Sequence, residues 1–303
     1  MTEALGRAAA VIDGFERLDG RFLLAALLLQ LCNLGFRAAA WRNVLAAAYP
    51  GRRISFLSVG GAYAAGVAIN AFTPGRAGEL AKAALIRARI PGSALPTIVA
   101  TLSVILVFDA LLGATLVATL WGLGFLPALP SVPSPGAAGV GAAALLTVAV
   151  VVLRRRPAFL RRIAAQALDG LAVLRVPARY LGTVVPFQLA AWSCRIGVVM
   201  LVLAAFRIEA SVAAATLVVV AGGVATAVPV PGGIGTQQVL VAFALRSTAS
   251  VASAVSFSIG MQLGVTLVNT LIGMTALMLM LRTMRPVAAL RSGLATVRAT
   301  RTG

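Results

Sequence analysis

Histidine, lysine, acidic residues and cysteine are absent or scarce in this chain of 303 residues. No histidine is present, which removes the commonest general base and metal ligand. The two cysteines, Cys32 and Cys194, lie in apolar runs and cannot form a zinc site by themselves. We therefore expect no metal site, no cofactor and no enzymatic activity.

Charge is also scarce. Charged residues make up 11% of the chain, against roughly 25% in an average soluble protein. Apolar residues make up 60%, and the mean hydropathy is +0.98. So few charges cannot cover a water-exposed surface, so we expect an integral membrane protein. Disordered, collagen-like and disulfide-scaffold classes are excluded by the same composition.

The charges that are present are mostly positive, with 26 Lys plus Arg against 8 Asp plus Glu. A net charge of +18 is typical of nucleic-acid binding. We reject that interpretation because the arginines lie between and after apolar runs, as cytoplasmic loop charges do. Lys82 is the one lysine. The richness in Arg and Ala suggests a GC-rich bacterial genome, and hence a bacterial cytoplasmic membrane.

Apolar runs divide the chain into membrane segments. They cover residues 22–48, 55–72, 95–121, 137–153, 181–206, 211–228 and 251–281, with a weaker run at 237–249. A membrane-spanning helix needs about 20 residues. We predict an all-α polytopic bundle of about seven to eight membrane segments. A single transmembrane domain, 22–281, has halves at about 22–121 and 181–281, and residues 1–21 form an interfacial helix.

The arginines predict the orientation. Residues 154–179 carry seven arginines against Asp169, and the tail 282–303 carries five arginines without an acid, so both should be cytoplasmic. Residues 122–136 hold four prolines and no charge, so they should face the other side. An even number of crossings then places both termini in the cytoplasm. Arg52 and Arg53 break this scheme, because they would face out.

One short motif occurs twice. Pro74-Gly-Arg76-Ala-Gly78 recurs as Pro231-Gly-Gly-Ile-Gly235, 157 positions later, and each copy follows an apolar run. Helices broken at matching positions indicate a transporter-like site. We expect the two breaks to share one cavity near the membrane midplane. They are either surface loops or the tips of re-entrant hairpins, 55–89 and 211–249; the second alternative places the N-terminus outside.

Polar residues inside the apolar runs need partners or a purpose, because a charge at the bilayer centre costs about 2.5–3.5 kcal/mol. Arg37 and Trp41 share one face of the first helix, where they either bind a ligand or anchor the helix at the interface. Asp109 should pair with Arg37 or Arg76. Arg195 lies deep in a later run.

The stretch from Asn70 to Lys82 is the densest polar cluster in an apolar region. Glu79 can pair with Arg76 and Lys82 at i,i+3 spacing. The Pro-Gly break before it exposes N–H groups at a helix N-terminus, which favours anions. A polar stripe in the last run more often holds helices together than lines a path. It consists of Ser258, Gln262, Thr266, Asn269 and Gly273.

Together these motifs resemble the lysylphosphatidylglycerol synthase transmembrane, or flippase-like, family over about residues 22–281. Its recurring features appear here as Arg37, Trp41 and Arg42, then Asn70 to Glu79, Asp109, and Pro229 to Gly235. Two family charges are missing: Ile105 to Phe108 replace a Glu-Arg pair, and Gln237 or Gln238 replaces a glutamate. The residues after Arg282 are too few for an aminoacyl-transferase domain, so lysyl-lipid synthesis is not implied.

The resemblance implies binding and translocation of an amphiphilic lipid with an anionic or isoprenoid-type headgroup, held at the broken helices. One alternative is a non-catalytic membrane partner of a lipid or cell-envelope biosynthesis enzyme. Another is an intramembrane lipid transferase, which would have to use Glu79 or Asp109 as its base. The candidate headgroup-binding residues are Arg37, Trp41, Asn70, Pro74, Arg76, Glu79, Asp109, Arg195, Pro231, Gly232, Gly233 and Gln238.

Overall fold

The computed structural model describes residues 19–73, 77–124, 157–225, 235–246 and 248–283. Within these ranges every regular element is a helix, as predicted. Four spans are long and apolar enough to cross a membrane: α2 (Gly20–Ala48), α5 (Leu95–Gly122), α8 with α9 (Pro177–Thr183 and Val185–Ala205), and α12 (Val251–Thr283). The apolar helices α3 (Phe56–Phe72) and α10 (Val212–Ala225) are shorter. The predicted run 137–153, and all of the interfacial helix except residues 19–21, lie outside the described residues.

Local sequence signals explain several helix starts. The Asp19 carboxylate accepts a hydrogen bond from the backbone N–H of Arg21 at 2.9 Å and caps α2. α5, α8 and α9 each have a proline in the first turn. A proline there lacks only an N–H that the helix would leave unpaired. The basic segment 154–179 contains α7 (Pro157–Gly170), the 3₁₀ turn η2 (Ala172–Arg175) and the start of α8.

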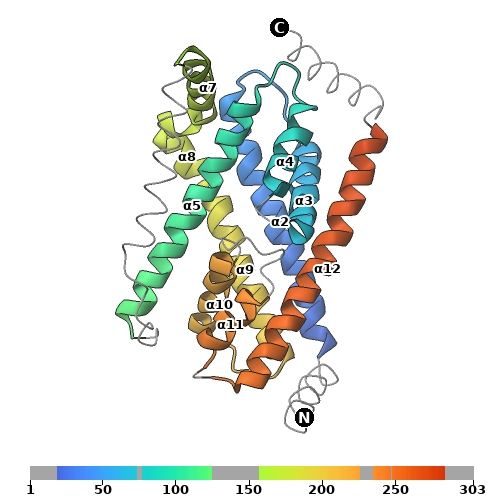
Figure 1. Cartoon of the computed structure of the whole chain (residues 1–303), viewed down its shortest axis with the longest axis vertical. Coiled ribbons are helices and arrows are strands. Elements are labelled where there is room, and N and C mark those ends of the chain that lie inside the picture. Colours follow the sequence, from blue (N-terminus) through green and yellow to red (C-terminus); the bar gives the residue numbers. More distant parts are fainter. Residues whose placement is uncertain (1–18, 74–76, 125–156, 226–234, 247, 284–303) are drawn as a thin grey trace.

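Two pairs of short helices reach only part of the way through the bundle. α3 pairs with α4 (Ala77–Arg87) towards one end, and α10 pairs with α11 (Thr236–Ala244) towards the other (Figure 1). α3 and α4 cross at Gly66 and Gly78, where an added Cβ on either glycine would overlap the backbone or side chain of the other helix. Each pair therefore packs closely within the bundle near one of its two ends.

The hairpins change the number of crossings. α2 begins at one end of the bundle and α12 finishes at the opposite end (Figure 1). An even number of crossings would bring both to the same end, so that expectation is wrong for the arrangement of these helices. The physical reason is that α3 with α4, and α10 with α11, each lead back to the end of the bundle at which the pair begins (Figure 1).

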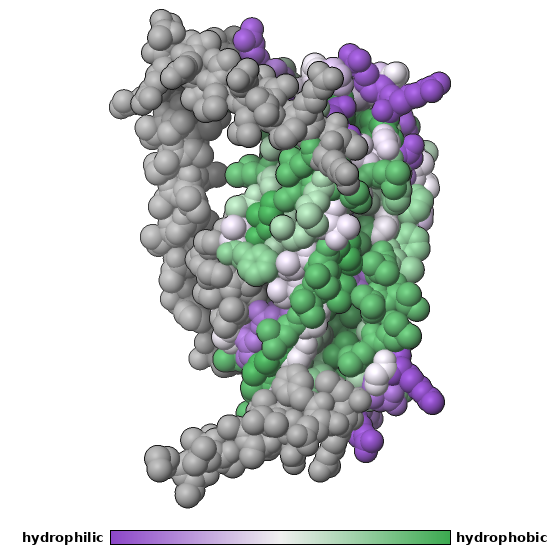
Figure 2. Space-filling model, turned by 90° about the vertical axis from the view of Figure 1, so that its right-hand side faces the viewer, coloured by the Kyte–Doolittle hydropathy of each residue, from purple (hydrophilic) through white to green (hydrophobic). Residues whose placement is uncertain are grey.

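Most of the loop arginines that the structure describes lie at one end of the bundle. The α2–α3 and α4–α5 connections lie at the same end as α7 and α8 (Figure 1). Arg52 and Arg53 are in the first of these connections and therefore lie on the side of the basic segment, not opposite it. On the face in Figure 2, hydrophobic residues form a band between hydrophilic residues at the two ends. This is the surface expected of a protein in a bilayer.

Close helix contacts hold the two halves together. In α12, an added Cβ on Gly273 would meet the backbone of Ala64 and the methyl of Ala68 in α3. Gly197 of α9 likewise receives the side chain of Leu29 from α2, 2.6 Å from where its Cβ would lie. Small residues that let helices approach closely are the usual means of association in membranes. Gly273 therefore has the helix-joining role expected for its stripe.

Candidate functional site

A cavity of about 390 Å³ lies inside the bundle. Four helices of the first half, α2 to α5, and four of the second half, α9 to α12, contribute to its wall. Thr73 and Glu79 line it from either side of the first Pro-Gly break, and Gln237 lines it from just after the second. The charged residues on its wall are Arg37, Glu79, Lys82, Asp109 and Arg195.

The first ion pair joins α2 to α5. Arg37 and Asp109 make two contacts, Nη1 to Oδ2 at 2.6 Å and Nη2 to Oδ1 at 3.3 Å. The indole Nε1 of Trp192 in α9 also donates to Asp109 Oδ1, at 2.7 Å. The prediction that Asp109 pairs with an arginine is confirmed, and the partner is Arg37. This carboxylate ties together three helices that lie far apart in the sequence.

The second ion pair lies in the α3–α4 hairpin. Lys82 Nζ is 2.8 Å from Glu79 Oε1, which confirms that part of the predicted i,i+3 pairing. The same ammonium lies over the ring of Tyr63, 4.0 Å from its centroid. Asn70 fastens the hairpin, since its amide donates to Glu79 Oε1 at 3.1 Å and its carbonyl accepts from the Gly78 N–H at 2.7 Å.

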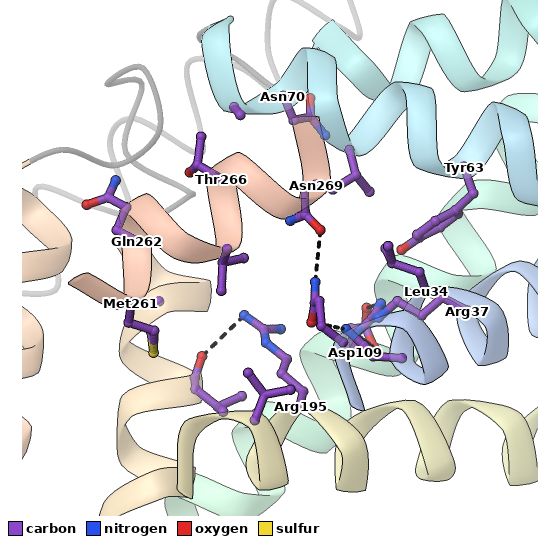
Figure 3. Close-up of a pocket in the computed structure, with 18 of the residues that line it drawn as sticks. Leu34, Arg37, Tyr63, Asn70, Asp109, Arg195, Met261, Gln262, Thr266 and Asn269 are labelled. Carbon is purple, nitrogen blue, oxygen red and sulfur yellow. Dashed lines mark hydrogen bonds and ion pairs between the residues drawn. The ribbon is translucent and has the colours of Figure 1, made fainter. Parts of the chain in front are cut away.

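Arg195 is the third cation and differs from the other two. Its Nη2 donates to the carbonyl of Val219 at 3.5 Å, and its guanidinium carbon lies 5.8 Å from the centroid of the Trp192 ring. Among the described residues, no carboxylate lies within ion-pair distance of it. Figure 3 shows its guanidinium facing the same space as Arg37 and Asp109. The described wall therefore holds three cations and two carboxylates.

Side-chain amides line another part of the wall. Asn33 donates to Gln30 at 3.2 Å, and Gln30 donates to Asn269 of α12 at 2.9 Å. The Oδ1 of Asn33 is buried without a hydrogen-bond partner. Gln262, Thr266 and Asn269 of the α12 stripe all face the cavity (Figure 3). Two of them also join helices, since Asn269 accepts from Gln30 of α2 and Gln262 accepts from Gln238 of α11, so the stripe has both roles.

The comparisons with known proteins agree with this membrane bundle. The family model described as "Lysylphosphatidylglycerol synthase TM region" matches residues 5–273, nearly the whole chain. The chain belongs to this family. No curated protein and no solved structure matches it.

The cavity brings together several of the family's motif residues. Arg37, Asn70, Glu79 and Asp109 all line it. Trp41 does not: it is completely buried, and its indole donates to the hydroxyl of Thr101 at 3.0 Å. Trp41 is therefore a core residue in this structure, one helical turn away from the cavity that Arg37 reaches.

The other candidates are placed as follows. Arg195 lines the cavity, whereas Gln238 is not part of the wall. Gln238 accepts from the Gly235 N–H at 2.7 Å, where a φ of 84° favours glycine, and it donates to Gln262. It thus fixes the start of α11 against α12. Pro74, Arg76, Pro231, Gly232 and Gly233 lie outside the described residues.

Several polar wall residues were not among the candidates, and Gln30, Tyr63 and Gln237 are examples. Gln30 lies three residues before Asn33 and seven before Arg37, so helical spacing could have placed it on their face, whereas Tyr63 is an isolated polar group that gives no pattern. Gln237 was considered only as a substitute for a family glutamate. Within the described ranges no three metal-binding side chains come together. The two wall carboxylates both contact cations, so the cavity's chemistry is that of ion pairs and hydrogen bonds.

Proposed function

We propose that the protein binds an amphiphilic lipid and translocates it across the membrane, with the headgroup in the cavity. The observation that carries this proposal concerns the charges around a cavity inside an apolar bundle. Among the described residues that line it, three are cations and two are carboxylates, so one positive charge has no negative partner. Charges at membrane depth are costly and mark substrate paths more often than structural sites. An anionic headgroup, such as a phospholipid or isoprenoid phosphate, would neutralise Arg195.

The two hairpins suggest how the lipid would move. They enter from opposite ends of the bundle, and residues next to both breaks line the same cavity. In transporters, broken helices related in this way bind the substrate and open alternately to each side. Displacement of one hairpin would open the cavity to one leaflet while the other hairpin keeps it closed. The acyl chains would stay in the bilayer throughout.

We propose the following orientation in a bacterial cytoplasmic membrane. The end with the α2–α3 and α4–α5 connections, α7 and α8 carries many arginines, among them Arg52, Arg53, Arg87, Arg89, Arg162, Arg175 and Arg179, against Asp169. The opposite end carries Arg21, Arg207 and Arg246 with Asp19 and Glu209. The positive-inside rule makes the first end cytoplasmic. The N-terminus is then outside and the C-terminus inside.

The transferase alternative is less well supported. Asp109 and Glu79 are each held by a cation at 2.6 and 2.8 Å, so neither is free to act as a general base. We therefore propose that the protein is not an enzyme. Nothing in the described residues favours the alternative of a non-catalytic partner over translocation.

A test in liposomes without any partner protein decides between these functions. The purified protein is reconstituted with fluorescent phosphatidylglycerol or, separately, fluorescent phosphatidylcholine, and dithionite quenching reports movement between leaflets. We expect faster movement of the anionic probe, slowed at least tenfold by Arg195→Gln and unchanged by Asp169→Asn. Folded protein that moves neither probe would contradict translocation and favour the partner alternative.

A further inference from the structure

One position on the cavity wall lacks a side chain and has two hydrogen-bond donors close to it. Gly222 of α10 lacks a side chain, and a Cβ built there would lie 3.9 Å from Nη2 of Arg195 and 4.0 Å from Nε2 of Gln237. All three residues line the cavity, and they come from α9, α10 and α11. Two N–H-bearing groups from different helices therefore face one small space that a glycine leaves open.

The first donor has unused capacity. A guanidinium has five N–H donors and no acceptor. The one described acceptor of Arg195 is the carbonyl of Val219, at the long distance of 3.5 Å. The two carboxylates on the described part of the wall already have cationic partners, since Asp109 pairs with Arg37 and Glu79 with Lys82. The space beside Gly222 is thus positively charged.

The second donor adds to this polarity. Gln237 lies in the first turn of α11, a helix of nine residues whose N-terminal end is positive because its first backbone N–H groups lack helical partners. A guanidinium and a side-chain amide that lie near one position, with the amide carried by the first turn of a helix, form an environment that suits an oxyanion. Each contributes hydrogen bonds or positive potential, and none contributes a negative charge.

We propose that Arg195 and Gln237 form an oxyanion subsite above Gly222, and that it binds a phosphate group. This inference rests on the proposed function for the source of the phosphate, a lipid headgroup, whereas free inorganic phosphate has the same chemistry. Gly222 determines specificity, because it leaves room for an oxygen between the two donors. The site belongs to the second half of the chain, and neither of its two donors takes part in the two described ion pairs.

Neighbouring glycines in α10 provide a matched test. Gly222→Leu would fill the space between the donors without removing either of them. Gly223→Leu is the control, because a Cβ at Gly223 meets nothing within 4 Å. Gly222→Ala is a milder second variant whose methyl would make ordinary van der Waals contacts, so it should fold even if the leucine does not.

Binding is measured by isothermal titration in detergent with two probes, inorganic phosphate and dihexanoyl phosphatidic acid. We expect Gly222→Leu and Arg195→Gln to weaken binding roughly 10- to 100-fold, as loss of a charge-assisted hydrogen bond does. Arg195→Lys should restore part of it, and Gly223→Leu should bind as the wild type does. A lipid-only response identifies a headgroup subsite, and an equal response to both probes identifies a general phosphate subsite.

Equal affinities of wild type, Gly222→Leu and Gly222→Ala for both probes would overturn the subsite. This outcome is separable from failure of the proposed function. If the variants weaken binding but wild type moves no lipid in liposomes, the subsite stands and translocation fails. If lipid moves equally fast in wild type and Gly222→Leu, translocation stands and the subsite fails.

Discussion

Removing the charge of Asp109 tests the energetics of the cavity wall. Its carboxylate makes two contacts with Arg37 and accepts from Trp192, and the two paired side chains are only 20% and 10% exposed. Asp109→Asn keeps the shape and an acceptor for the indole but leaves the Arg37 charge buried without its partner. Breaking a buried pair on one side typically costs about 3–5 kcal/mol. Because both side chains line a cavity, we expect the lower value, about 3 kcal/mol.

The free energy of unfolding would be measured by SDS titration in mixed micelles. Asp169→Asn is the matched control, since this acid is exposed on α7 and should change stability by less than about 0.5 kcal/mol. The double variant with Arg37→Gln removes both buried charges, so its loss should be smaller than the sum of the single losses by at least about 1 kcal/mol. Equal effects of Asp109→Asn and Asp169→Asn, or strict additivity, would refute the buried-pair reasoning.

Three further outcomes are expected. Gly78→Ala should destabilise the protein by about 1–3 kcal/mol, because its methyl would overlap a carbonyl oxygen of α3, whereas Gly264→Ala, with nothing within 4 Å, should not. In a background without the native cysteines, an impermeant maleimide should label Ser250→Cys in intact cells and Arg52→Cys only after lysis; the reverse would invert the proposed orientation. Trp192→Phe removes a hydrogen bond to a charged group and should cost about 1.5–3 kcal/mol in the same SDS titration; no change would mean that the bond contributes nothing.

Much of the chemistry of the wall could be predicted from local sequence. Glu79 and Lys82 are three residues apart on one helix, so their pairing follows from helical geometry alone. A carboxylate in an apolar run must find a cation, so a partner for Asp109 could be predicted without knowing which arginine it is. The surroundings of each side chain could not be predicted. Arg37 and Trp41 share a face of one helix, yet Arg37 lines the cavity and Trp41 is buried in the core.

Composition and hydropathy by themselves determined the membrane class, the helical fold and the four long spans, because the bilayer forces every spanning segment to satisfy its own backbone. Only the tertiary structure decided at which end of the bundle each loop lies, since a short apolar run can either continue to the far end or turn back, and α3 and α10 turn back with α4 and α11. Packing between distant segments likewise selected Arg37 for Asp109 and brought Arg195 and Gln237 to Gly222. Such contacts depend on how the helices pack against one another, and the spacing of residues along the chain does not determine that packing.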